Sequence, residues 1–198
     1  AGLAGRAGPG ARRHARSARE RRALLRAVLK RLPRWDALVL SDYAKGVFDE
    51  ALLTTFIRAA RRHRTPVIAD LKPELLLTAR GVAIVAPNER EALQATKAKS
   101  FSLAGKILSR KLRSAVLITR GEHGMALFAK NKVQHFPAVA REVFDVAGAG
   151  DTVTAVLALA IGSGATLPDA ASLANRAAGI VVGKVGVATV TPQELLQV

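Results

Sequence analysis

The chain has 198 residues, of which 49% are apolar but only 4% aromatic, a balance that suits the buried strands and close-packed helices of a single α/β domain. It contains no cysteine, which excludes disulfides, cysteine-ligated zinc and thiol catalysis. There is no run of about 20 apolar residues to span a membrane, and the basic N-terminus lacks the apolar segment of a secretory signal. We therefore expect a cytoplasmic protein with no membrane partner.

The formal net charge of +16 is concentrated near the N-terminus. Eleven of the 31 lysines and arginines precede Trp35, and only Glu20 opposes them there. Such a segment could bind nucleic acid or an anionic surface; alternatively, it is a disordered lead followed by a solvated helix face. We favour the second interpretation and expect no nucleic-acid partner, because no aromatic side chain alternates with these charges to stack on bases.

Residues 1–17 are a basic Gly/Ala/Arg lead whose low complexity predicts disorder, and residues 18–198 form the predicted domain. Hydrophobic periodicity and turn residues predict helices over residues 17–32, 49–63, 88–95, 101–112, 149–161 and 168–185. Strands are expected over residues 37–41, 66–70, 82–86 and 115–119, followed by a hairpin of residues 124–129 and 133–136. Apolar strands that alternate with helices indicate a parallel sheet covered on both faces.

Polar residues stand where four of the expected strands end. They are Ser41 with Asp42, Asp70, Asn88, and Thr119 with Arg120. In open α/β sheets, ligands bind in a crevice outside the carboxyl ends of the strands. Any one of these residues could be an ordinary turn residue, but four together at one edge predict a ligand site.

The strongest local pattern is a run of small residues that ends in Asp151 and is followed at once by an apolar helix. The amides of Gly148, Ala149 and Gly150 could approach a phosphate closely, and the helix would point its positive end at the same place. A carboxylate there would repel phosphate unless it accepts a proton from an attacking hydroxyl. Alternatively, Asp151 is only an acidic residue in a first helical turn. No Gly-x-x-x-x-Gly-Lys-Ser/Thr segment is present, so the chain is not a P-loop NTPase.

A second pattern is Asn88-Glu-Arg-Glu91, at the start of a predicted helix. Positions i and i+3 share a helix face, so Asn88 and Glu91 could hold hydrated Mg²⁺ near phosphates, Glu91 through a water molecule. The same two residues at the same spacing also make an N-cap with its capping box. Spacing alone favours the cap.

Three further features could contribute to the site. The turn that contains Thr119, Gly121 and Gly124 could donate hydroxyl and amide groups to a nucleotide, or be a plain glycine-rich turn. Lys72 could reach a phosphate, or be solvated as most lysines are. Asn175 lies on the last long predicted helix, where one helix face could close over a base.

These segments, in this order, resemble the ribokinase/PfkB family of carbohydrate kinases. The matching residues are Asp145 and Gly148–Asp151 for the Asp…Gly-Ala-Gly-Asp signature, Asn88 and Glu91 for the Asn-x-x-Glu motif, and Thr119, Gly121 and Gly124 for the Thr-x-Gly-x-x-Gly turn. The resemblance implies a ribokinase-like three-layer α/β/α fold with a mostly parallel sheet and a C-terminal antiparallel hairpin. The Gly-Gly-Asn signature and the small β lid of that family are not recognisable here, so we expect an N-terminally truncated version.

Within the family, residues 39–46, 144–152, 174–186 and 191–194 are most similar to the bacterial heptose 7-phosphate kinases. That similarity implies transfer of the γ-phosphoryl group of ATP to the anomeric hydroxyl of D-glycero-β-D-manno-heptose 7-phosphate, a step of lipopolysaccharide core synthesis. The cofactors would be ATP and Mg²⁺, and the partner a small sugar phosphate.

The resemblance also implies individual roles. Asp151 would be the catalytic base, and the segment Asn88, Glu89, Arg90 and Glu91 would contact ATP and its metal. Lys72 would lie near the phosphates, Asn175 near the adenine, and Asp42 and Lys45 at the sugar. The alternatives are another PfkB sugar or nucleoside kinase, or a non-catalytic remnant that binds nucleotide or a partner chain. A sheet with an unpaired edge strand would favour a homodimer.

Overall fold

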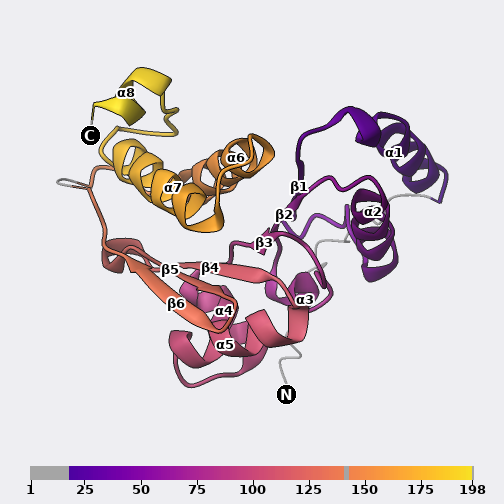
Figure 1. Ribbon diagram of the computed structural model, residues 1–198, viewed down its shortest axis with the longest axis horizontal. Helices are drawn as coiled ribbons and strands as arrows, with labels where there is room; N and C mark the ends of the chain where they lie inside the picture. Colours follow the sequence, from indigo (N-terminus) through magenta and orange to yellow (C-terminus); the bar gives the residue numbers. More distant parts are fainter. Residues whose placement is uncertain (1–17, 141–142, 198) are drawn as a thin grey trace, which may run out of the picture.

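The computed structural model describes residues 18–140 and 143–197, so the basic lead expected over residues 1–17 lies outside the described residues. At its centre is a six-stranded sheet in the order β1-β2-β3-β4-β5-β6 (Figure 1). The strands are β1 (Leu38–Ser41), β2 (Val67–Asp70), β3 (Ile84–Val85), β4 (Ala115–Thr119), β5 (Met125–Ala129) and β6 (Lys132–Phe136). The first four run parallel, and β5 and β6 form an antiparallel hairpin. The predicted mostly parallel sheet with a hairpin is confirmed.

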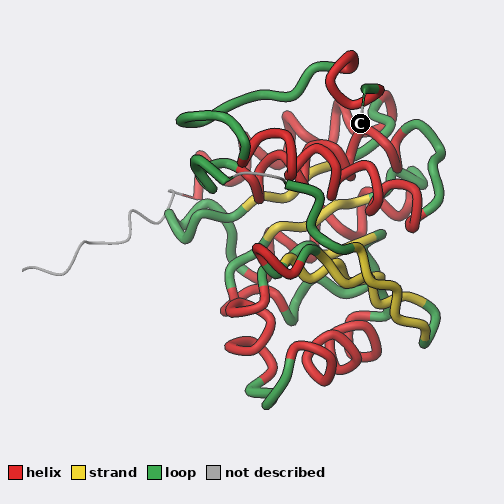
Figure 2. Tube along the Cα trace, turned by 90° about the vertical axis from the view of Figure 1, so that its left-hand side faces the viewer, coloured by secondary structure: helices red, strands yellow, loops and turns green. Residues whose placement is uncertain are grey.

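Helices cover both faces of this sheet, as Figure 2 shows. One face carries α1 (Ala18–Arg31), α2 (Glu50–Arg62), α3 (Pro73–Leu76), α4 (Glu89–Thr96) and α5 (Phe101–Leu112). The other carries α6 (Ala149–Gly162) and α7 (Leu167–Val182), with α8 (Pro192–Leu196) beyond them. Each parallel strand lies beside the next one in sequence, and right-handed crossovers therefore place α2 to α5 on the same face. The three-layer α/β/α architecture is confirmed.

The core is divided by the sheet into two clusters. Successive strand residues point to opposite faces, so Val116 and Ile118 pack with the α2 and α5 side, whereas Leu117 packs with the α6 and α7 side. All three are fully buried. The strands are apolar on both faces because both faces are covered, which is why they read as unbroken apolar runs.

Most expected elements appear within one or two residues of their predicted bounds, with three differences. Strand β3 keeps only two of the five residues expected over 82–86. Helix α7 ends at Val182 and is followed by Gly183 as its C-cap, three residues before the expected end. Two short helices, α3 and α8, were not predicted; each begins with a proline at its first turn, where the missing amide costs nothing. Among the described residues, no helix is both long and apolar enough to cross a membrane.

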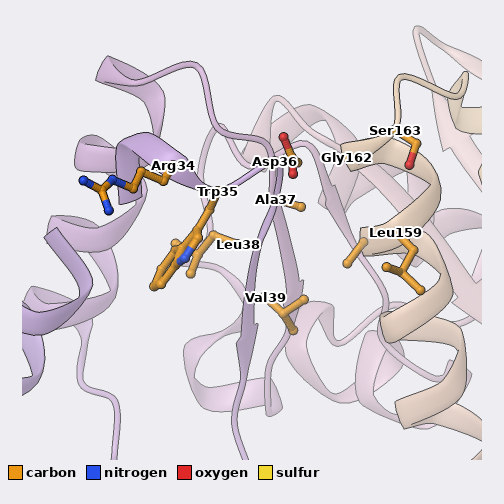
Figure 3. Close-up of a pocket in the computed structure, with 10 residues that line it drawn as sticks. Arg34, Trp35, Asp36, Ala37, Leu38, Val39, Leu159, Gly162 and Ser163 are labelled. Atoms are coloured by element: carbon orange, nitrogen blue, oxygen red, sulfur yellow. The ribbon is translucent and has the colours of Figure 1, made fainter. Parts of the chain in front are cut away.

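Strand β1 lies at one edge of the sheet and pairs only with β2 among the described strands. A groove of about 700 Å³ follows this edge, between residues 34–39 and the last turn of α6. In Figure 3, Val39 of β1 and Leu159 of α6 line opposite sides of this groove. None of the residues predicted for the ligand site lines this groove.

Gly105 is where α5 packs most tightly on the sheet. A Cβ atom there would lie 2.4 Å from the ring of Phe128, which is buried in β5. We expect Gly105→Ala to lower the free energy of unfolding, because overpacking costs about 1–3 kcal/mol and exceeds the gain of at most about 1 kcal/mol in helix propensity. Urea denaturation measures the change. Gly150→Ala is the control, since among the described residues nothing beyond its chain neighbours and its own helix backbone lies within 4 Å of an added Cβ; equal stability changes in both variants would contradict the packing argument.

Candidate active site

The polar residues at the strand ends meet at one edge of the sheet, as predicted. Ser41 and Asp70 are partners across β1 and β2, and the amide of Asp42 donates to the carbonyl of Asp70 at 2.8 Å. Asn88, just after β3, pairs with Thr119 at the end of β4 in an isolated parallel bridge. The crevice outside the carboxyl ends of the strands is therefore lined by side chains that can bind a polar ligand.

The glycine-rich turn before α6 presents the start of that helix to the crevice. Gly148 is the N-cap residue and has φ +78°, a conformation that favours glycine, and within residues 18–140 and 143–197 no side chain caps the helix. The amide of Ala149 donates to the carbonyl of Val146 at 3.3 Å. The amides of Gly150 and Asp151 lie in the first turn, where the helix offers no acceptor. The amide of Ala149 is therefore already bonded, and Gly150 is the residue of the predicted anion hole whose amide remains available. The amide of Asp151 is a second available donor.

Asp151 is exposed in the first turn of α6 and accepts a hydrogen bond from a residue that the sequence did not single out. The hydroxyl of Tyr43 donates to its Oδ1 atom at 2.6 Å. This bond is the main cause that raises the pKa of Tyr43 above its usual 10. Tyr43 is the only tyrosine of the chain and follows directly on the polar end of β1, which is the one signal in the sequence that could have identified it.

Four carboxylates gather around this end of the sheet, and the charges of the other three change the pKa of Asp70. Its pKa is raised from 3.8 to about 6, first by burial and then by the charge of Glu91, with smaller contributions from Asp151 and Asp42. Lys72 opposes this shift, and its Nζ atom lies 2.7 Å from Oε1 of Glu91. That bond to Glu91 is the main cause that raises the pKa of Lys72. Lys72 is thus held at the acidic cluster as a counter-charge.

Asn88 and Glu91 make the capping box that their spacing favours. Oδ1 of Asn88 accepts from the Glu91 amide at 2.8 Å, and Oε2 of Glu91 accepts from the Asn88 amide at 3.0 Å. No three Asp, Glu or His side chains in residues 18–140 and 143–197 are grouped closely enough to hold a metal ion by themselves.

The neighbours of Glu91 on α4 point elsewhere. Glu89 accepts from Nε of Arg120 at 2.9 Å, and the guanidinium of Arg120 lies 3.7 Å from the centre of the Phe101 ring. This contact joins α4 to α5 through a cation–π pair. Arg90 is exposed on the same helix. In this structure Glu89 therefore supports the helix packing, and its predicted contact with ATP stays a prediction.

A cavity of about 510 Å³ adjoins the start of α6. Its lining includes six of the residues predicted for the anion hole and the ATP site, namely Thr119, Gly121, Gly124, Ala149, Gly150 and Asn175. Lys72 and residues 88–91 are not part of this lining; they lie at the neighbouring strand ends. The structure thus divides the predicted ATP residues between a mainly apolar cavity and an acidic crevice.

Two tight contacts shape the wall of that cavity. Gly124 has φ +72°, and a Cβ atom there would lie 2.0 Å from the carbonyl oxygen of Phe136, so no other residue fits. Asn175 is buried on α7, and its Nδ2 atom donates to the carbonyl of Pro137 at 2.8 Å. The amide of Asn175 thereby holds the segment after β6 in place, and its predicted role near the adenine stays a prediction.

The raised pKa of Asp70 predicts a pH-dependent stability. A carboxyl group whose pKa is higher in the folded state stabilises the fold below pH 3.8 and loses that contribution as the pH rises through about 6. We expect Asp70→Asn to raise the free energy of unfolding at pH 7.5, by about 1–2 kcal/mol after allowance for solvent screening, and to change it little at pH 4. Urea denaturation at the two pH values measures this. Asp36→Asn, an exposed carboxylate at the other end of β1, is the control; a pH-independent effect of Asp70→Asn would be contrary to the assignment.

Comparisons with known proteins agree with this geometry. Residues 12–194 match the family described as pfkB family carbohydrate kinase. The chain is 45% identical over 183 residues to the bifunctional protein HldE of Paramagnetospirillum magneticum, which covers 89% of this chain and 38% of that protein. It is 46% identical over 191 residues to HldE of Caulobacter vibrioides, covering 92% of this chain and 40% of the relative. The chain therefore spans about two fifths of the length of these relatives.

Solved structures show the same fold at lower identity. Phosphofructokinase-2 from Escherichia coli in complex with potassium superposes with a TM-score of 0.82 at 19% identity, covering 92% of this chain and 62% of that one. Ribokinase from Arabidopsis thaliana, complexed with ribose and ATP, gives a TM-score of 0.71 at 23% identity, covering 92% of this chain and 59% of that one. The chain has two glycine-bearing turns, Asp151 at the start of α6 and a family match over nearly its whole length. It belongs to the pfkB family of carbohydrate kinases.

Proposed function

We propose that the chain is an ATP-dependent sugar kinase that phosphorylates the anomeric hydroxyl of D-glycero-β-D-manno-heptose 7-phosphate to give the 1,7-bisphosphate and ADP. The observation that carries the proposal is the position of Asp151. It lies in the first turn of α6, directly after Gly150 of the cavity lining, and its charge acts on Asp70 at the strand ends. The choice of sugar rests on the similarity of residues 39–46 and 144–152 to the heptose 7-phosphate kinases and agrees with the identity to HldE.

The cavity is the proposed site of the nucleotide. Its volume of about 510 Å³ lies within the roughly 300–1,000 Å³ that is usual for small-molecule and cofactor sites. Its apolar wall along α7, near Asn175 and Gly179, suits the face of the adenine, and the start of α6 contributes Gly150 to the same lining. The phosphates would therefore extend towards the amino end of α6, where the backbone amides and the helix dipole favour negative charge.

Asp151 and the groups around it would then each have a separate role in the transfer of the phosphoryl group. Asp151 accepts the proton of the anomeric hydroxyl while that oxygen forms a bond to the γ-phosphorus, and the bond from phosphorus to the bridging oxygen of ADP breaks. The amides of Gly150 and Asp151 hold the oxygens of the transferring group. Lys72, held by Glu91 beside the crevice, is a counter-charge for the phosphates.

The loop after β1 is the proposed sugar side. Asp42 is buried, and its Oδ1 atom accepts from the amide of Ala44 at 3.0 Å, so it shapes the loop. Lys45 is exposed on the same loop and could pair with the phosphate of a sugar phosphate.

Three finer assignments belong to the same proposal. Bound Mg²⁺ would neutralise charge on the β- and γ-phosphates, and Glu91, with Asn88, would hold it through water. The edge of β1, which no other described strand pairs, is the proposed interface of a homodimer. The cytoplasm is the proposed location, because ATP and sugar phosphates are available there.

Replacement of the proposed base tests the function most simply. We expect Asp151→Asn to lower turnover of ATP and heptose 7-phosphate by about 10²–10⁴ because it keeps the shape and removes the proton acceptor. ATP affinity should hold or rise slightly, since a negative charge near the phosphates disappears. Turnover is measured as ADP released per folded molecule at saturating substrates. If Asp151 were only an acidic residue of a first helical turn, turnover would stay within about threefold, far below the general-base range.

Glu91 can be tested separately from its capping role. Glutamine also completes a capping box, so Glu91→Gln should melt close to the wild type. If Glu91 orients water around Mg²⁺, the Mg²⁺-dependent affinity for a non-hydrolysable ATP analogue should fall by about 10–100-fold, the range for outer-sphere partners of a metal. Calorimetry at several Mg²⁺ concentrations measures this affinity.

The chain holds a matched control for that experiment. Glu194 makes the same capping box with Thr191 and the same kind of ion pair, its Oε1 atom 2.6 Å from Nζ of Lys184. Glu194→Gln should leave nucleotide affinity unchanged. If neither variant loses affinity, Glu91 is only a cap and a partner of Lys72, and its role at the metal is rejected.

A further inference from the structure

We propose that Tyr43 is a positioning residue for the catalytic base: its hydroxyl fixes one carboxylate oxygen of Asp151 so that the other faces the acceptor hydroxyl of the sugar. This inference rests on the proposed function, because it assigns a role in that reaction. It starts from a contact between the loop after β1 and the first turn of α6, 108 positions apart in sequence.

The geometry of the contact defines donor and acceptor. The Tyr43 hydroxyl lies 2.6 Å from Oδ1 of Asp151. An ionised carboxylate only accepts hydrogen bonds, so Tyr43 is the donor, and the distance lies in the range of about 2.5–2.7 Å for a charge-assisted O–H···O⁻ bond. Within residues 18–140 and 143–197, no other side chain donates to this carboxylate. Oδ2 therefore stays available to accept a proton.

The loop that carries Tyr43 is held in one conformation. On one side of Tyr43, the amide of buried Asp42 donates to the Asp70 carbonyl at 2.8 Å. On the other side, Ala44 has φ +56°, and its amide donates to Oδ1 of Asp42 at 3.0 Å. A non-glycine residue in this region costs of order 1–3 kcal/mol and persists where its surroundings enforce it. The hydrogen bonds of this turn therefore hold the backbone on both sides of Tyr43, next to Asp151.

The charges around Tyr43 keep its proton in place. The hydrogen bond to Asp151 is the largest cause that raises its pKa, and burial and the charges of Asp151 and Asp70 act in the same direction. Only Ser41, at the end of β1, acts in the opposite sense. Tyr43 therefore remains a donor near neutral pH and is not itself the base.

The bond matters because Asp151 is exposed and could otherwise rotate about its Cβ–Cγ bond. A base must meet the hydroxyl at hydrogen-bond distance, and a displacement of about 1 Å can cost up to about 10²-fold in rate. Anchoring Oδ1 directs Oδ2 without consuming the acceptor that the reaction needs.

A titration tests the contact without any turnover. Tyr43 is the only tyrosine, so the ultraviolet absorbance of the phenolate, followed against pH with circular dichroism to confirm folding, reports on this residue alone. We expect Asp151→Asn to move the titration to lower pH because the charged acceptor is lost. Asp145→Asn is the matched control: this carboxylate lies in the same turn, but its Oδ1 accepts from the Ala147 amide. If Asp151→Asn titrates as the wild type does, the positioning role is rejected.

A double-mutant cycle tests the role in catalysis. Tyr43→Phe should lower kcat by about 10–100-fold, within the range for a misplaced group, with KM for ATP unchanged, and it should cost nothing further in the Asp151→Asn background. Equal losses in both backgrounds would mean that Tyr43 acts independently of Asp151, and a faster Tyr43→Phe enzyme would mean that Tyr43 blocks the base; either result overturns the proposal. A folded wild-type chain without turnover would instead reject the proposed function, and the positioning role with it, whereas an unchanged titration with turnover intact rejects only Tyr43.

Discussion

The site depends on one electrostatic conflict: carboxylates gather at the same sheet edge as a helix start that favours phosphate. The parallel register of β1 to β4 places Asp42, Asp70 and Glu91 at this edge, and α6 adds Asp151. The pKa of Asp70 is raised to about 6 first by burial, and the charges of Glu91, Asp151 and Asp42 add to that shift while Lys72 opposes it. A nucleotide with its cation, and a proton moving from sugar to carboxylate, would relieve the same conflict.

The backbone supplies what side chains cannot in this arrangement. Gly148 turns the chain into α6 with a positive φ, and no side chain in the described part of the chain caps the first amides of the helix. Gly124 lets the turn after β4 pass within contact distance of the segment after β6, where a side chain would collide with backbone. Asn175 fastens that same segment to α7. Small residues therefore recur in both patterns because each turn depends on backbone geometry that a side chain would disturb.

The sequence was sufficient for what depends on local pattern and failed for what depends on distant contacts. Helix α5 and strand β4 have the predicted bounds, because periodicity, caps and flanking turns all agree there. The gathering of strand ends followed from parallel pairing alone. In contrast, the bond of Tyr43 to Asp151 joins residues 108 positions apart, and the turn of Glu89 towards Arg120 depends on how α4 packs on α5. No spacing rule contains such contacts.

A crystal structure of the folded chain with Mg²⁺ and a non-hydrolysable ATP analogue tests the central claim most directly. We expect the adenine to lie against α7 in the cavity near Asn175. The γ-phosphate should then lie at the Gly150 amide, with the Asp151 carboxylate beside it. The groove between β1 and the end of α6 offers a larger space, about 700 Å³, and is the natural competitor. A nucleotide bound in that groove, or one whose γ-phosphate lies far from Asp151, would contradict the account.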